Sequence, residues 1–302
     1  MTQKLVPIHF DYVNNSQFNA FATVREGWGI MGMLIGSLIL PYDMFSRMLA
    51  HPQVLPNIGK PGEESVNVQH SEGIARNHDF MAARIARRQS PDTIRPKSEP
   101  RRAFASYATT LAFKMLVWHE FAHIANGHFE YLENSQANAI LVEMQRLGAG
   151  QRPPDFTRQA IEMDADRTAA AIGIFDCIHS THEDFKRIAA MPKDALFAWT
   201  FAISGMLAIW RLGYRYDGTD PYHPTTGLRF QLIVQVIQSL FASQYPEVAQ
   251  KARQIMFDAG EQFLIATKAI EGDLTDDETW ALVRESDSSD VEDYRAKIVA
   301  RW

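Results

Sequence analysis

His119, Glu120 and His123 interrupt the first half of the run VWHEFAHIANGHFEYL, and their types and spacing could do chemistry. His119 and His123 are four residues apart, so on a helix both imidazoles lie on one face and can bind a single zinc ion at about 2 Å. Glu120 would then reach a water on the metal, as a general base for water attack must. The alternative is a pair of core histidines whose ring nitrogens are satisfied by hydrogen bonds. A third metal ligand would decide between the two interpretations.

A third histidine does not occur where one known zinc pattern requires it. The pattern H-E-x-x-H-x-x-G-x-x-H needs a glycine three residues and a histidine six residues after His123. Those positions hold Asn126 and Phe129, and Gly127 and His128 each miss by one residue. The sequence therefore excludes that class of site, and a third ligand must come from elsewhere in the chain.

A second helix is predicted over RQAIEMDADRTAAAIG, ending near Gly173. Glu162 and Asp166 share one face of this helix because they are four residues apart. Glu162 would complete a set of two histidines and one glutamate, which leaves the fourth zinc position open to water. Asp166 could accept a hydrogen bond from the outer nitrogen of His119 or His123 and fix its orientation. The alternative for both acids is a solvated helix face, but the alanines around them favour close packing against the first helix.

The segments HEFAHIANGH and EMDAD, the second of which fits E-x-x-A-D, resemble the gluzincin metalloproteases typified by HtpX and the CAAX prenyl proteases. The resemblance implies a zincin-like core in which His119, His123 and Glu162 bind one Zn²⁺ and Asp166 supports a ligand. It also implies an endopeptidase that uses Glu120 as its base. Soluble Lit-type phage-exclusion peptidases carry the same two motifs and cut a cytosolic host protein, which gives an alternative biological role for the same chemistry.

Two shorter matches flank these motifs in the order of the family. The segment NAFATVREGWGIMGMLIG resembles the N-A-F-A segment with its edge strand, and this implies substrate binding by Asn19, Ala20, Phe21 and Ala22. Residues 24–31 are then expected to form an open strand edge that pairs with an extended substrate. The segment YHPTTGLRF resembles the H-P…R segment, which implies that His223 lies near the zinc and stabilises the oxyanion. The alternative for His223 is an ordinary loop histidine.

The elements that must position these residues are mostly helical. Strand patterns occur only within residues 5–35, and helical periodicity dominates from Phe104 onward. The helix through the motif is expected to end at Asn126-Gly127, and it carries an apolar stripe at spacings of three and four. The stripe consists of Phe104, Tyr107, Leu111, Met115, Trp118 and Ala122. We therefore predict an α+β fold that is predominantly helical, with a small edge-strand sheet.

A protease domain is predicted over residues 1–250, followed by a helical acidic tail over residues 251–302. Within the domain, residues 51–102 form a loop-rich insertion with the basic run RIARRQSPDTIRPKSEPRR. Because the insertion leads into the helix of the zinc motif, both of its ends are expected beside the active site, where it could act as a lid. The alternative is a solvated surface loop.

Composition limits the partners and the location of the protein. The net charge of -6 and the pI near 5.9 argue against a nucleic-acid partner. The single cysteine, Cys177, excludes an intramolecular disulfide and favours a reducing cytoplasm, and no signal peptide is expected.

Two apolar runs are candidates for contact with a membrane. The runs at 28–40 and 195–210 have 13 and 16 residues, whereas a spanning helix needs about 20. Membrane insertion is therefore not expected, and the runs predict a strand that turns into a helix and a buried core helix. We expect a cytoplasmic zinc endopeptidase that acts on a protein or peptide, with its oligomeric state left open. A zinc-stabilised binding scaffold without turnover is the alternative.

Overall fold

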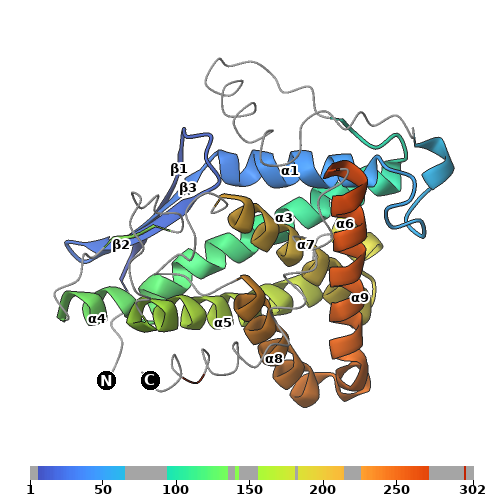
Figure 1. The fold of residues 1–302 in the computed structure, drawn as a ribbon. Helices are drawn as coiled ribbons and strands as arrows, with labels where there is room; N and C mark the ends of the chain where they lie inside the picture. The colour runs from blue at the N-terminus through green and yellow to red at the C-terminus, as the bar shows by residue number, and fades with distance from the viewer. Residues whose placement is uncertain are drawn as a thin grey trace.

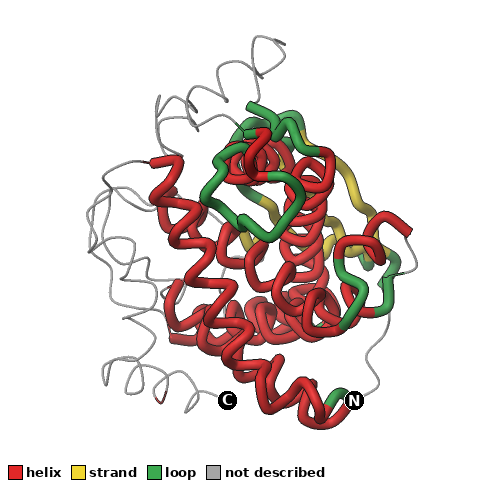
Figure 2. Tube along the Cα trace, turned by 90° about the vertical axis from the view of Figure 1, so that its right-hand side faces the viewer, coloured by secondary structure: helices red, strands yellow, loops and turns green. Residues whose placement is uncertain are grey.

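The computed structural model describes residues 6–64, 94–134, 140–142, 156–180, 183–213, 226–271 and 296. The described part is predominantly helical with one small sheet, which confirms the predicted α+β class (Figure 1). The helices form the body of the molecule, and the strands lie on one side of it (Figure 2). In chain order the elements are β1 (Ile8–Val13), β2 (Ala20–Arg25), β3 (Trp28–Leu34), α1 (Gly36–Leu49), η1 (Pro61–Glu63), α3 (Glu99–Ala125), α4 (His128–Asn134), β4 (Ile140–Val142), α5 (Phe156–Ile178), α6 (Glu183–Ile188), α7 (Pro192–Gly213), α8 (Thr226–Gln244) and α9 (Pro246–Glu271).

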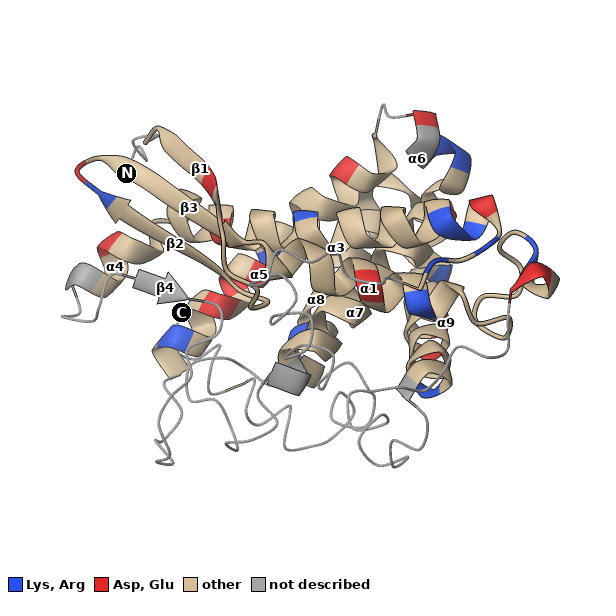
Figure 3. Ribbon diagram, turned by 90° about the horizontal axis from the view of Figure 1, so that it is seen from above, with Lys and Arg blue, Asp and Glu red and all other residues tan. Residues whose placement is uncertain are grey.

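The sheet has four strands in the order β1-β3-β2-β4, and Figure 3 shows β1, β3 and β2 side by side. β2 and β3 form an antiparallel hairpin whose turn residues, Glu26 and Gly27, have φ angles of 51° and 78°, as a type I′ turn requires. β1 runs parallel to β3, and β4 pairs antiparallel with β2 at Phe21–Thr23. The side of the hairpin that faces the core is apolar and buries Ala20, Ala22, Met31 and Met33.

The open strand edge expected at residues 24–31 is wrong for β3. This strand lies between β1 and β2, so both of its sides are hydrogen-bonded within the sheet. The outer side of β2 is paired with β4 at Phe21–Thr23. The edge strands are therefore β1 and β4. Alternation of side chains marks a strand but does not encode which strands lie beside it, and for this reason the sequence pattern misplaced the edge.

The helix through the zinc motif, α3, lies between α1 and α5 (Figure 1). Its predicted apolar stripe is buried at every position except Trp118, which is half-buried. α3 ends at Ala125, with Asn126 as its C-cap and Gly127 in the left-handed region at a φ of 74°. The predicted helix end is thus confirmed, and glycine is the residue that adopts this φ without strain.

The run at 195–210 lies inside the protein, and the run at 28–40 is mostly buried apart from Trp28 and Leu38, which are 52% and 41% exposed. β3 continues through Ile35 into α1, as predicted, and at Gly36 an added Cβ would lie only 2.1 Å from the carbonyl oxygen of Ser16. The run at 195–210 lies in α7, where Trp199 and Trp210 are each 1% exposed, which confirms the predicted core helix. Among the helices of the described ranges, none has the length and hydropathy required to cross a membrane.

The predicted stop of α5 at Gly173 is wrong, because the helix continues to Ile178. An added Cβ at Gly173 would lie 3.1 Å from Nε1 of Trp199, so the glycine allows α7 to pack closely against α5. A glycine inside a helix costs about 1 kcal/mol relative to alanine and does not by itself end the helix. Sequence spacing cannot separate a glycine that ends a helix from one that admits a neighbouring side chain.

The predicted domain boundary after residue 250 falls inside α9. Residues 251–271 are helical, and one face of α9 packs against α7 and α8. The buried residues of that face are Ala252, Met256, Ala259, Phe263 and Ala266. This part of the predicted tail therefore belongs to the same packed core as α7. The acidic segment at 272–295 and residues 297–302 lie outside the described residues.

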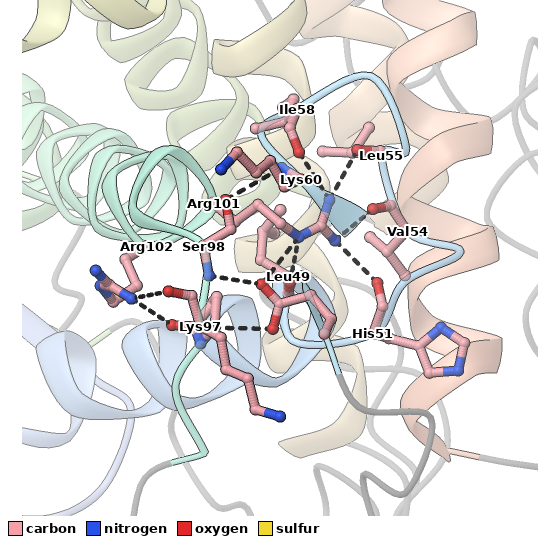
Figure 4. Close-up of polar contacts among 12 residues, drawn as sticks. Leu49, His51, Val54, Leu55, Ile58, Lys60, Lys97, Ser98, Arg101 and Arg102 are labelled. Atoms are coloured by element: carbon pink, nitrogen blue, oxygen red, sulfur yellow. Dashed lines mark hydrogen bonds and ion pairs between the residues drawn. The ribbon is translucent and has the colours of Figure 1, made fainter. Parts of the chain in front are cut away.

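Arg101, near the start of α3, holds the first part of the predicted insertion against the helix (Figure 4). Its side chain is fully buried and donates hydrogen bonds of 2.7–3.0 Å to five backbone carbonyls, those of Leu49, His51, Val54, Leu55 and Ile58. A buried carbonyl without a donor costs about 1–3 kcal/mol. One guanidinium therefore supplies hydrogen-bond donors to the backbone carbonyls of a loop that has little regular secondary structure.

Glu64 joins the two described ends of the insertion. Its carboxylate accepts hydrogen bonds from the backbone N–H groups of Lys97 and Ser98, both at 2.9 Å, and lies 3.7 Å from Arg101. Arg101 is 18 residues before His119 in the same helix, which is a distance of about 27 Å along its axis. The prediction that both ends lie beside the active site is therefore wrong, because α3 carries the zinc motif near its opposite end. Residues 65–93 lie outside the described residues.

We expect Arg101→Met to lower the free energy of unfolding by about 3–5 kcal/mol, because it leaves the Glu64 carboxylate and five carbonyls buried without their cation. Chemical denaturation measures the change. Lys97→Met is the matched control, since the Lys97 side chain is exposed and only its backbone N–H bonds to Glu64. The control should change the free energy of unfolding by less than about 0.5 kcal/mol. Equal losses in the two variants would contradict the role given to Arg101.

Candidate metal centre

α3 and α5 bring the candidate residues together. α3 carries His119, Glu120 and His123, and α5 carries Glu162 and Asp166. Within the described chain these two helices pack more extensively than any other pair of elements. Both helices carry fully buried alanines, Ala122 in α3 and Ala165, Ala169 and Ala170 in α5. All five candidate residues are at most 4% exposed, so the alternative of a solvated acidic face is wrong.

Three possible ligand atoms converge between the helices. Nε2 of His119 lies 3.0 Å from Nε2 of His123 and 3.1 Å from Oε2 of Glu162. Nε2 of His123 lies 3.6 Å from the same oxygen. Atoms at the corners of a tetrahedron around a zinc ion, each about 2.0–2.1 Å from it, are about 3.3–3.4 Å apart. The three residues therefore fit a metal ion, and in the described part of the chain they are the one group with metal-ligand spacing.

Asp166 contacts His119 on the side away from the ligand atoms. Its Oδ1 lies 3.0 Å from Nδ1 of His119, and Arg229 of α8 donates to its two oxygens at 2.7 and 2.8 Å. Burial by itself would raise the pKa of Asp166, but Arg229 and the hydrogen bonds from His119 and Arg229 hold that pKa below its usual value. The carboxylate accepts the Nδ1–H of His119, and this tautomer leaves Nε2 available to a metal.

Arg229 is a further candidate for a role in the site, because it binds Asp166. The spacing of residues in the sequence does not by itself predict this role. Its guanidinium carbon lies 4.0 Å from the centre of the Trp210 ring, and the residue is 2% exposed. The aromatic face and the Asp166 carboxylate together compensate the buried cation. Arg229 is the arginine of the YHPTTGLRF segment, so the resemblance marked the position without its function. The pairing with Asp166 spans 63 residues and is visible only in the folded chain.

His123 has a different neighbour on its outer side. Its Nδ1 lies 2.9 Å from Nδ1 of His128, which is 3% exposed. Burial lowers the pKa of His123, although Glu162 opposes this effect, so the imidazole is neutral at pH 7. The neutral ring is the form that binds a metal. His128 misses the position of a ligand in the zinc pattern by one residue, yet the structure places it against the site.

The residues expected to bind substrate lie at the start of β2. Asn19, Ala20 and Ala22 are buried, and Phe21 is half-buried. The backbone N–H of Asn19 donates to Oγ of Ser37 at 2.9 Å, and its carbonyl accepts from the same hydroxyl at 2.7 Å. These contacts tie the strand to α1. The structure thus gives this segment a packing role, and its use in substrate binding stays a prediction.

We expect Asp166→Asn to weaken zinc affinity by roughly 10- to 100-fold, because the amide replaces the charged acceptor behind His119. Competition with a chromogenic chelator measures the affinity. Asp176→Asn is the matched control on the same helix, where Asp176 pairs with Lys114 in a half-exposed position away from the ligands. If the two variants bind zinc equally well, Asp166 does not support the ligand.

The gluzincin resemblance rests on short motifs, and the structure now shows that the residues of the two central motifs meet. His223, the residue that the outer motif would add, lies outside the described residues. Comparison with protein-family models, with curated proteins and with solved structures found no match to this chain. The function of this chain is therefore inferred from the geometry of the site and from the two central motifs.

Proposed function

We propose that this chain is a zinc-dependent endopeptidase. The observation that carries the proposal is the convergence of two imidazole nitrogens and one carboxylate oxygen within 3.6 Å of one another, with Glu120 on the same helix as the histidines. Two histidines and one glutamate form the ligand set of hydrolytic zinc sites that keep one position open. The imidazoles favour zinc over magnesium or calcium, which prefer oxygen ligands.

The described residues supply most of the parts that the proposed reaction needs. His119, His123 and Glu162 would hold the ion. When bound by these residues, a zinc ion would supply Lewis acidity, which polarises a scissile carbonyl and brings the pKa of a bound water to about 7. Glu120 takes the proton from the attacking water and delivers it to the leaving amine. Asp166 keeps His119 in the tautomer whose Nε2 faces the metal.

The proposed substrate is a protein or peptide. The acidic net charge of -6 supports this choice over a nucleic acid. By resemblance to the gluzincins, His223 would donate a hydrogen bond to the oxyanion, and the segment at Asn19–Ala22 would contact the substrate. The resemblance to Lit-type peptidases supports a cytoplasmic role in phage defence, in which the enzyme cuts one host protein.

A zinc-stabilised binding scaffold without turnover is the second candidate. It needs the three ligands but has no use for Glu120. That residue is 1% exposed, and burying a carboxylate costs several kcal/mol before any compensation. An acidic side chain kept at such a position next to two metal-binding histidines supports the enzyme over the scaffold.

Elemental analysis should find one zinc per chain in the wild type and in Glu120→Gln, because the base contacts water and not the ion. The same measurement on His123→Ala or Glu162→Ala should find the zinc lost. His179→Ala serves as the control, since His179 bonds to Tyr245 and is not among the grouped ligands. Full zinc content in His123→Ala would contradict the assigned ligand set.

Cells that express the wild type should contain new protein N-termini that are absent from cells expressing Glu120→Gln. Loss of a general base slows a reaction by roughly 10²- to 10⁴-fold, while the zinc and the fold are retained. Mass spectrometry of enriched N-termini makes the comparison. If both cell populations give the same set of N-termini, the endopeptidase proposal fails and the scaffold takes its place.

A further inference from the structure

A series of hydrogen-bonded polar groups leads away from His123, from the buried His128 to the half-buried Asp164 and Asn126. Nε2 of His123 faces the other two ligand atoms, and its Nδ1 lies 2.9 Å from Nδ1 of His128. Nε2 of His128 then lies 3.2 Å from Oδ2 of Asp164 in α5. The same oxygen accepts a hydrogen bond of 2.6 Å from the side-chain amide of Asn126, which also donates to Oγ1 of Thr168 at 3.0 Å. This series of hydrogen bonds thus ends on the Asp164 carboxylate of α5, which also accepts a hydrogen bond from Asn126 at the C-cap of α3.

The turn at the end of α3 is what places His128 against His123. If the helix continued, a residue five positions on would project about 140° away around its axis. Instead, Gly127 at a φ of 74° interrupts the helix, and α4 begins at His128. A non-glycine residue resists this φ, so the turn depends on Gly127. The local sequence Asn126-Gly127-His128 therefore delivers an imidazole to the outer face of His123.

The directions of the hydrogen bonds from His123 to His128 and from His128 to Asp164 follow from the requirement of metal binding. Nε2 of His123 must be without a proton to bind an ion, so the proton of this ring is on Nδ1 and is donated to Nδ1 of His128. His128 then carries its own proton on Nε2 and donates it to Asp164. Oδ2 of Asp164 accepts the hydrogen bonds from both His128 and Asn126, as a carboxylate oxygen can.

The geometry points to His128 and Asp164 as positioning residues that orient His123 for metal binding, as Asp166 does directly for His119. We propose this role on the basis of the proposed metal site. Asp164 and Asp166 are two residues apart on α5 and so project about 200° apart around that helix. The imidazole of His128 spans the space between the Asp164 carboxylate and His123. Each histidine ligand thus has its own support from α5.

A pair of substitutions at His128 separates an orienting role from simple filling of the core. His128→Phe keeps the volume of the ring and removes both ring nitrogens. His128→Asn gives up part of the volume but keeps an acceptor, its side-chain oxygen, near the position of Nδ1. If His128 acts by packing, phenylalanine is the milder change. If it acts by accepting the Nδ1–H of His123, asparagine is the milder one.

The test measures Zn²⁺ affinity by competition with a chelator and records the visible absorption spectrum of the Co²⁺-loaded chain. We expect His128→Phe to bind Zn²⁺ roughly 10- to 100-fold more weakly and to change the Co²⁺ spectrum. We expect His128→Asn, which keeps the acceptor for His123 but loses the contact with Asp164, to bind Zn²⁺ only several-fold more weakly. Unchanged affinity in the phenylalanine variant overturns the proposal. A loss in the asparagine variant as large as that in the phenylalanine variant also overturns it.

Asp164→Asn provides a second test that does not depend on the folding of the phenylalanine variant. The Asp164 side chain is 25% exposed, and the amide keeps an acceptor for His128 but loses the charge. Zn²⁺ affinity should fall several-fold, by less than in His128→Phe. Affinity equal to that of the wild type overturns the role of Asp164, whether or not the other variant folds.

These measurements separate the positioning proposal from the proposed peptidase activity, because metal affinity requires no turnover. A chain that binds Zn²⁺, shows the expected affinity losses and cleaves no protein would remove the endopeptidase function alone. A chain that cleaves protein and binds Zn²⁺ equally well in all three variants would remove the positioning role alone. A wild type that binds neither Zn²⁺ nor Co²⁺ overturns both proposals.

Discussion

The contact between α3 and α5 is the constraint on which the candidate site depends. Between these helices, Nε2 of two histidines and a glutamate oxygen lie within 3.6 Å of one another. Both helices also carry fully buried alanines, among them Ala122 and Ala165, whose small side chains are compatible with a close approach. Such a contact removes ionisable groups from water, which is strongly unfavourable unless they are paired or bind a metal. The close packing of these helices therefore requires that the buried polar groups be paired with one another or bind a metal.

Further polar groups lie behind the ligand atoms and fix their orientation. His119 is tied to Asp166, and Asp166 is tied to Arg229, whose cation lies over an aromatic ring. His123 is tied to His128 on its own outer side. In a low-dielectric interior each satisfied hydrogen bond is strong and each missing one is costly, so such networks select a single arrangement. A ligand set held in this way is preorganised for an ion.

Local patterns were sufficient for most of the elements. The strand that turns into α1, the end of α3 at Gly127 and the core helix at 195–210 all follow from side-chain periodicity and from the special φ of glycine. The contacts between elements were not predictable in the same way. The edge of the sheet depends on the strand order, and the role of Gly173 depends on Trp199. The position of the insertion ends depends on Arg101. These are contacts between distant segments, which local periodicity does not encode.

The sequence by itself determined that His119, Glu120 and His123 stand on one helix near its end, because a spacing of four places two imidazoles on one face. It also marked Glu162 and Asp166 as partners on a second helix. Only the tertiary structure decided that Asp166 meets His119 and not His123, and that Arg229 and His128 complete the surroundings. Side-chain spacing fixes direction within one helix, whereas distances between helices depend on packing of the whole core.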